Sequence, residues 1–359
     1  MSLRDVRRRA GRFVIAGFTG HTAPDDLRRL AAEFDLAGVI YFARNISEPA
    51  QVAELSREVA SLASEWPFWI SVDQEGGRVA RLRAPFTEWP PAHTLGRAGS
   101  DALAESYART LAAELRAVGF NLDYAPVLDV HTNPKNPVIG DRALSDNPEV
   151  AGRLGAAIIR TLQAEGITAC GKHFPGHGDT SVDSHFELPV VEHDRRRLDA
   201  VEFVPFREAV AAGVGLIMTA HVMMPAVDRD AIASFSRRVV SGMLKGSLGF
   251  EGVVVSDDLG MKAVSATTPL PEATVAAIAA GCDTVLLCNS TADEQHAAIE
   301  AVIRAAERGE LTPQRIDDAW ARQRAVKERL LAQSAAPPPL ACIGCEEHQM
   351  VAREMAAWA

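Results

Sequence analysis

The chain has 359 residues, 47% of them hydrophobic and 23% charged, a composition typical of a globular enzyme with a sizeable core. Its formal net charge of -10, with no basic patch interleaved with aromatic residues, argues against binding to nucleic acid or anionic membranes. The charged N-terminus precedes an apolar run, residues 13–18, that is too short for a signal-peptide core or a membrane span. We therefore expect a cytoplasmic protein, and we expect it to be a monomer.

In chain order, short apolar segments rich in β-branched residues alternate with amphipathic stretches, which predicts parallel strands separated by helices. Eight such units in this length favour a closed (β/α)8 barrel of the TIM type over an open doubly wound sheet. No GxGxxG turn follows the first strand and no GxxxxGK[ST] loop occurs, so a nucleotide-binding sheet lacks support. The predicted strands are 13–18, 38–42, 68–73, 121–127, 168–173, 216–221, 252–257 and 284–288. The predicted helices include 49–63, 101–118, 148–165, 198–212, 271–280 and 293–308.

The C-terminal part of the chain continues with a predicted surface helix over 313–331 and a Pro/Ala-rich linker. We expect residues 1–332 to form a single catalytic barrel domain and 333–359 to form the linker and a short helical tail. The tail contains Cys342 and Cys345, which have the spacing of half a zinc site, but no second pair lies nearby. The chain has five cysteines, and this odd, scattered set indicates a reducing compartment and not a disulfide framework. We expect the two tail cysteines not to bind zinc.

Polar residues lie at or just beyond the ends of five of the eight predicted strands. The carboxyl ends of barrel strands converge on one face, which carries the active site in barrel enzymes. A single such residue would be explained equally well as a helix N-cap or a solvated loop residue. Five strand ends together favour a functional site composed of Asp73, Asp129, Lys172, His173, His221, Asp257 and Asp258.

The segment from Lys172 to His185, KHFPGHGDTSVDSH, is the densest polar stretch of the chain. Its histidines and aspartates are the ligand types of a metal site. Alternatively, Asp183 and His185 form a carboxylate–imidazole pair for proton transfer, because alternate side chains of an extended segment point the same way. The residue spacing leaves both interpretations open.

Two further segments suggest sugar chemistry, although each is weak alone. An apolar strand ends in Ser256, Asp257 and Asp258, which places a carboxylate at the barrel mouth, where a glycosidase nucleophile is needed. The segment 71–82 combines Asp73 with two glycines and two arginines, and such carboxylate and guanidinium groups commonly hold sugar hydroxyls. Taken alone, the second segment is better explained by a structural Asp–Arg pair.

Taken together, the motifs DQEGGR (73–78), NPVIGDR (136–142), KHFPGHGDTSVDSH (172–185) and SDDLGM (256–261) resemble the family-three glycoside hydrolases. The resemblance is to their bacterial β-N-acetylglucosaminidase (β-hexosaminidase) branch and covers about residues 10–330. It implies proton transfer, and not metal binding, as the role of the loop 172–185, with no cofactor and no metal.

The resemblance also implies individual roles. It assigns His185 as the acid/base, with Asp183 behind it, and Asp257, not Asp258, as the nucleophile. It assigns binding of the sugar to Asp73, Arg81, Arg142, Lys172 and His173. The family's β-glucosidases take their acid/base from a larger second domain, for which this chain ends too soon, so we expect the acid/base to come from the barrel loop.

The function implied is that of a retaining exo-β-N-acetylglucosaminidase acting through a covalent glycosyl-Asp intermediate, with muropeptides of peptidoglycan recycling as the natural substrate. A β-glucosidase or broader exo-glycosidase on the same barrel is the alternative, followed by a metal-dependent hydrolase. The sequence leaves open the leaving group and whether water or phosphate is the acceptor.

Overall fold

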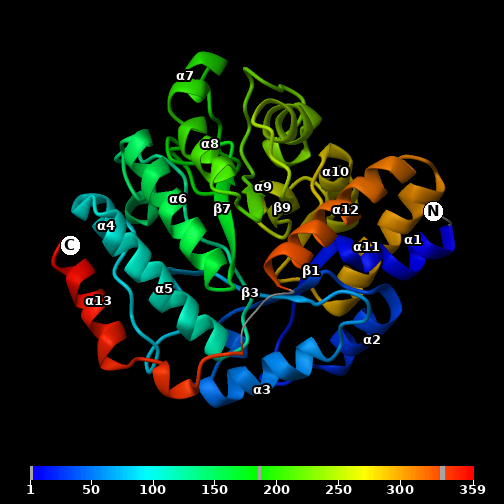
Figure 1. Ribbon diagram of the computed structural model, residues 1–359. Helices are drawn as coiled ribbons and strands as arrows, with labels where there is room; N and C mark the ends of the chain where they lie inside the picture. The colour runs from blue at the N-terminus through cyan, green and yellow to red at the C-terminus, as the bar shows by residue number, and fades with distance from the viewer. Residues whose placement is uncertain (1–2, 185–186, 332–335) are drawn as a thin grey trace.

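A closed barrel of eight parallel strands forms the centre of the molecule, in the order β1-β10-β9-β8-β7-β6-β3-β2. The computed structural model describes residues 3–184, 187–331 and 336–359. Every predicted strand is present, and the predicted (β/α)8 barrel is confirmed (Figure 1). The barrel strands are β1 (Val14–Gly17), β2 (Gly38–Tyr41), β3 (Trp69–Val72), β6 (Leu122–Asp123), β7 (Thr168–Phe174), β8 (Leu216–Thr219), β9 (Val253–Asp258) and β10 (Thr284–Leu287).

The strands are largely apolar because both of their faces are buried, and charged residues occur at their carboxyl ends, as in β7 and β9. Along β9, Val253 and Val255 belong to a cluster inside the barrel, whereas Val254 packs in the larger cluster between strands and helices. This alternation follows from the two-residue period of a strand. The interior is therefore a packed core, and only the strand ends are available for a site.

Helices surround the barrel. Six of the seven predicted helical segments are present as single helices with small shifts at their ends, and the seventh is divided. The predicted helix 198–212 is two helices, because Pro205 has no N–H to donate to the carbonyl of Val201 in a continuous helix. None of the helices in the described ranges is long and apolar enough to cross a bilayer. The helices are α1 (Leu3–Arg9), α2 (Asp25–Phe34), α3 (Pro49–Ala60), α4 (His93–Ala98), α5 (Asp101–Ala117), α6 (Pro148–Ala164), α7 (Arg195–Ala200), α8 (Phe203–Ala211), α9 (Lys262–Ser265), α10 (Leu270–Ala280), α11 (Ala292–Glu307), α12 (Pro313–Leu330) and α13 (Glu346–Ala356).

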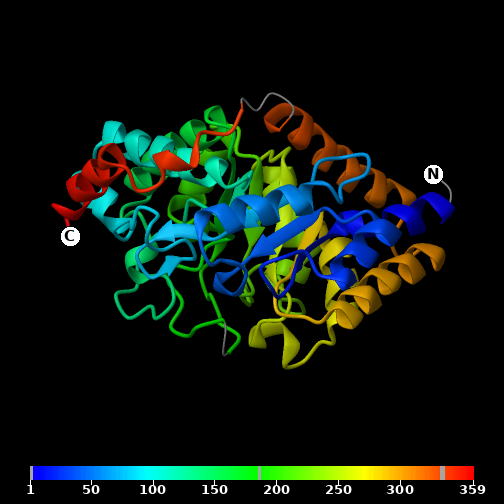
Figure 2. The same cartoon turned by 90° about the horizontal axis from the view of Figure 1, so that it is seen from below.

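The C-terminal tail lies against the barrel, with α13 beside α4 and α5 (Figures 1 and 2). The buried carboxylate of Glu114 on α5 holds it there by accepting the N–H of Gly344 and contacting Nδ1 of His348, both at 2.9 Å. The same carboxylate accepts hydrogen bonds from the amide and hydroxyl of Thr87. The predicted tail helix therefore packs on the barrel, and the predicted boundary between residues 332 and 333 lies outside the described residues.

Candidate active site

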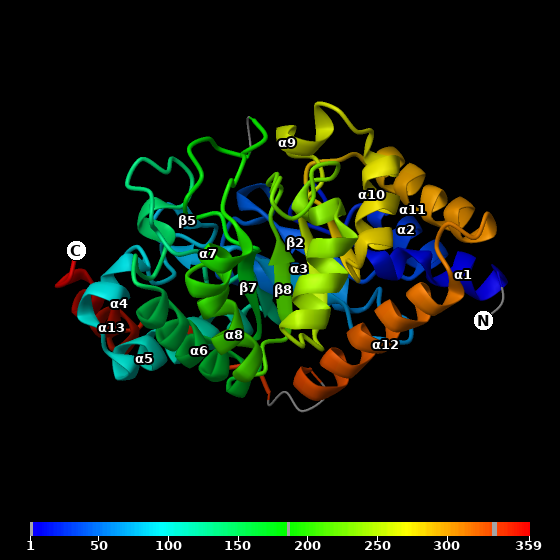
Figure 3. The ribbon, with the colours of Figure 1, turned by 90° about the horizontal axis from the view of Figure 1, so that it is seen from above.

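A pocket of about 380 Å³ lies at the carboxyl ends of the strands. The loops that follow β6, β7 and β9 gather on this side of the barrel, opposite α12 (Figures 2 and 3). The pocket brings together residues that are far apart in the sequence. Its wall includes six of the eight predicted site residues, Asp73, Arg81, Arg142, Lys172, His173 and Asp257.

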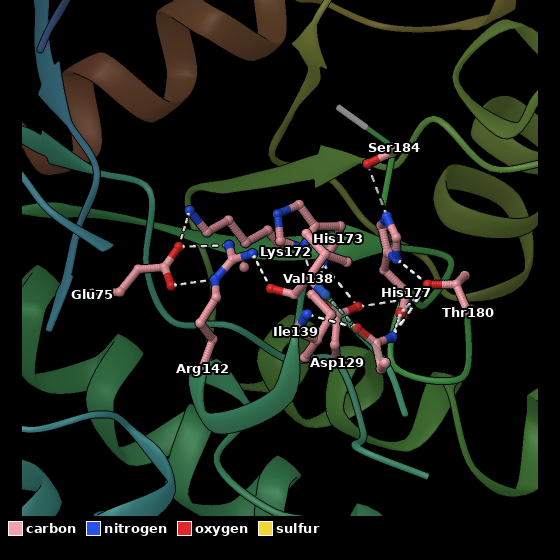
Figure 4. A network of polar contacts seen from close by, with 12 residues as sticks. Glu75, Asp129, Val138, Ile139, Arg142, Lys172, His173, His177, Thr180 and Ser184 are labelled. Atoms are coloured by element: carbon pink, nitrogen blue, oxygen red, sulfur yellow. Dashed lines mark hydrogen bonds and ion pairs between the residues drawn. The ribbon is translucent and has the colours of Figure 1, made fainter. Parts of the chain in front are cut away.

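A buried network of charges forms one wall of the pocket (Figure 4). Lys172 at the end of β7 lies 2.8 Å from Asp73 and 2.6 Å from Glu75. Arg142 donates two hydrogen bonds of 2.8 Å to the Glu75 carboxylate, a bidentate pair. Burial alone would raise the pKa of Glu75, but the charges of Arg142 and Lys172 hold it well below its usual value. Glu75 is therefore ionised and fixes both cations in place.

Asp73 follows β3 and is shared between two cations. Its Oδ1 accepts from Lys172, and its Oδ2 accepts from Arg81 at 3.3 Å. Arg81 lies at the partly exposed edge of the pocket, 27% accessible at its side chain, whereas Lys172 is fully buried. The predicted Asp73, Arg81 and Lys172 thus form one connected cluster.

Asp129 orients the two histidines of the β7 loop (Figure 4). Its Oδ2 lies 2.7 Å from Nδ1 of His173, and its Oδ1 accepts the backbone N–H of His177 at 2.7 Å. Burial would raise the pKa of Asp129, but the charge and hydrogen bond of His173 lower it. The ionised carboxylate fixes the tautomer of His173 with a proton on Nδ1, and Nε2 is left as the nitrogen that can serve a ligand.

The two aspartates that end β9 have different surroundings, although both line the pocket. Asp258 is buried, and its Oδ1 accepts the N–H groups of Cys288 at 3.0 Å and Gly260 at 3.1 Å, while Oδ2 accepts from Asn289 at 3.3 Å. Burial raises the pKa of Asp258. Asp257 is half-buried, with Oδ1 accepting the N–H of Asp258 at 2.8 Å. The Asp258 carboxylate is therefore committed to the fold, and Asp257 is the more accessible of the two.

His221, the polar residue just after β8, contacts the backbone at the end of β9. Its Nε2 donates to the carbonyl oxygen of Asp258 at 3.1 Å, and its Nδ1 lies 2.8 Å from the Ser234 hydroxyl. Burial lowers the pKa of His221, so the ring is neutral and supports the β9 backbone.

The predicted acid/base His185 lies outside the described residues. Asp183 lies just before it, half-buried, and its carbonyl oxygen accepts the N–H of Glu187 at 3.0 Å. The expected pairing of Asp183 with His185 therefore stays a prediction. Within the described ranges no group of three or more His, Cys, Asp or Glu side chains is arranged to hold a metal ion.

The roles of Glu75, Asp129 and His177 could not be predicted from the sequence. Glu75 was visible only as part of the DQEGGR motif, and its function depends on Arg142, which is distant in sequence. Asp129 was recognised as a strand-end residue, but nothing in the sequence pairs it with His173 and His177.

Comparison with known proteins gives a consistent result. The model of the glycosyl hydrolase family 3 N-terminal domain matches residues 13–326. Beta-hexosaminidase A of Pseudoalteromonas piscicida is 35% identical over 93% of this chain, which spans only 60% of that relative's length. Beta-hexosaminidase of Thiobacillus denitrificans is 43% identical over 74% of each chain.

Solved structures agree. A glycoside hydrolase family 3 beta-N-acetylglucosaminidase from Paenibacillus sp. superposes with a TM-score of 0.93 at 42% identity, covering 98% of this chain and 68% of that one. NagZ from Neisseria gonorrhoeae, in complex with N-trifluoroacetyl-D-glucosamine, has a TM-score of 0.78 at 31% identity over 97% of this chain and 98% of that one.

Proposed function

The chain belongs to glycosyl hydrolase family 3, and from this we propose that it removes non-reducing terminal N-acetylglucosamine from β-linked saccharides with retention of configuration. The observation that carries the proposal is that one pocket is lined by the half-buried Asp257 together with Lys172 and Arg142 of the charged wall. The names of the relatives, beta-hexosaminidase and beta-N-acetylglucosaminidase, support an N-acetylated sugar as the group that is bound.

In the proposed first step, an Asp257 carboxylate oxygen bonds to the anomeric carbon while the bond from that carbon to the leaving oxygen breaks. Protonated His185 gives its proton to the leaving oxygen. In the second step, neutral His185 takes a proton from water as the water oxygen attacks the anomeric carbon and the ester breaks. The carboxylate and the imidazolium are restored, and two inversions retain the β configuration.

An imidazole suits the acid/base role because it titrates near neutral pH without strong burial. We propose that Asp183 stabilises the imidazolium and orients the ring of His185. The choice of Asp257 over Asp258 as nucleophile is supported by the backbone hydrogen bonds that occupy the Asp258 carboxylate.

We assign sugar binding to the charged wall. The Asp73 carboxylate accepts hydrogen bonds from Lys172 and Arg81, and its remaining acceptor capacity can serve sugar hydroxyl groups. Arg142 and Lys172 are kept charged by Glu75, and His173 is oriented by Asp129. Five side chains then present donors and acceptors at fixed positions, which suits the recognition of one pyranose ring.

We propose that the natural substrate is a muropeptide released during peptidoglycan recycling in the cytoplasm, with water as the acceptor. A panel of p-nitrophenyl β-glycosides tests the sugar specificity. We expect the N-acetylglucosaminide to be cleaved far faster than the glucoside or the xyloside, and a preference for the glucoside would contradict the assignment.

A mechanism-based label tests the covalent step. A 2-acetamido-2-deoxy-5-fluoroglucosyl fluoride should accumulate as a glycosyl ester, because the fluorine slows both cationic transition states while fluoride is still a good leaving group. Peptide mapping should find one added sugar on the peptide that contains Asp257. Retention of configuration with an unlabelled Asp257 would instead indicate attack by the substrate's own acetamido oxygen.

A further inference from the structure

Within the loop that leads to His185, the buried side chains of His177 and Ser184 contact each other (Figure 4). Both residues are 2% exposed, and Nε2 of His177 lies 2.9 Å from the Ser184 hydroxyl oxygen. We propose that this His177–Ser184 pair positions the acid/base for proton donation, so that both are positioning residues for the reaction. The inference rests on the proposed function, in which His185, the next residue in the chain, supplies the proton.

The surrounding hydrogen bonds determine which residue of the pair donates and which accepts. Nδ1 of His177 lies 2.7 Å from Oγ1 of Thr180, and that hydroxyl donates its one proton to the carbonyl oxygen of His177 at 3.0 Å. Thr180 therefore accepts a hydrogen bond from the Nδ1–H group, which leaves Nε2 as an acceptor. Burial lowers the pKa of the ring to about 4, in agreement with a neutral imidazole. Ser184 accordingly donates to Nε2.

Both ends of the pair are fixed to the elements that build the pocket. The backbone N–H of His177 donates to Asp129, the carboxylate that also orients His173. The carbonyl oxygen of His177 accepts from the side chain of Asn136 at 2.8 Å. The carbonyl oxygen of Ser184 accepts the N–H of Ala263 at 3.2 Å, in α9, which follows the nucleophile strand. Ser184 is thereby linked on one side to the sugar-binding wall and on the other to the segment beyond Asp257.

This arrangement fixes the chain one residue before the proposed proton donor. Proton transfer depends steeply on the position of the donor, since general acid catalysis needs a heavy-atom separation near that of a hydrogen bond. Loss of the Ser184 hydroxyl should loosen the donor without removing it. The defect should therefore appear only where the leaving group needs a proton.

The test compares kcat/KM for two aryl β-N-acetylglucosaminides, because kcat/KM reports the first, glycosylating step. The 2,4-dinitrophenyl group departs without a proton, whereas the phenyl group needs one. For Ser184→Ala we expect a loss of roughly 10-fold on the phenyl glycoside and less than about twofold on the dinitrophenyl glycoside. Thr180→Val, which keeps the shape and removes the partner of Nδ1, should change the two substrates in the same direction but less.

A double-mutant cycle separates positioning from simple stability. In a His185→Ala background, Ser184→Ala should cost nothing further on the phenyl glycoside, because the group that it positions is gone. The matched control is Ser234→Ala, which deletes a second buried serine–histidine contact, that with His221, and should change both substrates in equal proportion.

The outcomes distinguish the inference from the function on which it rests. If His185→Ala shows the expected leaving-group dependence while Ser184→Ala loses equally on both substrates, or adds its full loss to His185→Ala, the positioning role is wrong and the glycosidase mechanism stands. If His185→Ala itself shows no leaving-group dependence, both proposals are wrong.

Discussion

Two buried lysines at opposite ends of the barrel have opposite surroundings. Lys172, at the carboxyl face, lies against the carboxylates of Asp73 and Glu75. Lys327 on α12, at the amino face, donates to the carbonyl oxygen of Ala37 at 2.9 Å, and its ammonium lies 4.3 Å from the centre of the Trp69 ring. Burial lowers the pKa of both amines, but the carboxylates raise that of Lys172 above its ordinary value, whereas that of Lys327 falls to about 7.

The different surroundings of the two lysines indicate different roles for the two ends of the barrel. At the carboxyl face, charges are held permanently by other charges, as expected of a site that must stabilise a changing charge on a ligand. At the amino face, a single amine closes the core with a carbonyl and an aromatic ring and has no carboxylate within hydrogen-bonding distance among the described residues. Substitutions at the first end should therefore affect catalysis, and substitutions at the second should affect stability.

The largest effect is expected at the carboxyl face from Asp257→Ala. Loss of a covalent nucleophile should reduce kcat on the order of 10,000-fold or more. Asp258→Asn is the matched control, since the amide retains an oxygen that can accept from Cys288, and it should keep activity within roughly 10-fold. Steady-state kinetics on p-nitrophenyl β-N-acetylglucosaminide measure both. A more severe loss in the control would mean that Asp258, and not Asp257, is the nucleophile.

The next largest effect is expected from Lys172→Met, which removes the shared cation from Asp73 and Glu75. We expect a loss on the order of 100- to 1,000-fold in kcat/KM, comparable to removal of one preorganised donor from an active site. The variant should also lose about 3 kcal/mol or more in the free energy of unfolding, because the buried Glu75 and the half-buried Asp73 keep only Arg142 and Arg81 as cations. An unchanged kcat/KM in a folded variant would show that the charged wall does not contact the sugar.

The sequence predicted the frame of this site better than its connections. Strand ends could be located because buried parallel strands are continuous apolar runs, and the ends of these runs placed Asp73, Lys172 and Asp257 on one face. The sequence did not predict which charged groups of the cluster pair with one another. Whether Lys172 pairs with Asp73, with Glu75 or with both depends on loop geometry that brings residues 73–75 and 142 together.

Outside the site, too, local sequence features were easier to interpret than long-range contacts. The break between α7 and α8 was signalled by Pro205, whose effect depends on its position within the first turn of a helix. The docking of α13 was not predicted, because Glu114 and His348 are 234 residues apart and no local pattern relates them. Local periodicity therefore predicts elements, whereas partners of buried polar groups need the three-dimensional structure.

At the amino face, Lys327→Met should change the pH dependence of stability and leave kinetics unchanged. The pKa of Lys327 is lowered from 10.5 to about 7, so between these values the unfolded chain binds the proton that the folded protein has lost. Stability contributed by this group therefore rises with pH across that window, by up to about 1.4 kcal/mol per pH unit, and is lost again as the pH falls through the window to about 7.

Urea denaturation of both proteins at several pH values from about 7 to about 10 measures the effect. The difference in unfolding free energy between wild type and Lys327→Met should shift with pH by that slope, whereas groups that titrate in both proteins cancel. A difference that is independent of pH would mean that Lys327 keeps its proton in the folded state. A change in kcat/KM at neutral pH would contradict the separation of the two ends.

The smallest effect, none at all, is expected from removal of metal ions. A metal-dependent hydrolase would need side chains of the β7 loop as ligands, but several of those that the structure describes are engaged with other protein groups. Both ring nitrogens of His177 contact hydroxyls, and Nδ1 of His173 is paired with Asp129. Asp179 accepts from Thr132 at 2.8 Å and lies 2.6 Å from Nε2 of His193.

Because positive charge at the carboxyl face is supplied by Lys172 and arginines, the proposed mechanism assigns no step to a cation. Activity on p-nitrophenyl β-N-acetylglucosaminide should therefore survive prolonged dialysis against EDTA, with elemental analysis to verify that the protein is metal-free. The control is the same protein dialysed without chelator. Loss of activity that returns on adding a divalent ion would show that the β7 loop rearranges to hold a metal, and the comparison between a charge-paired face and a core-closing face would then have to include that ion.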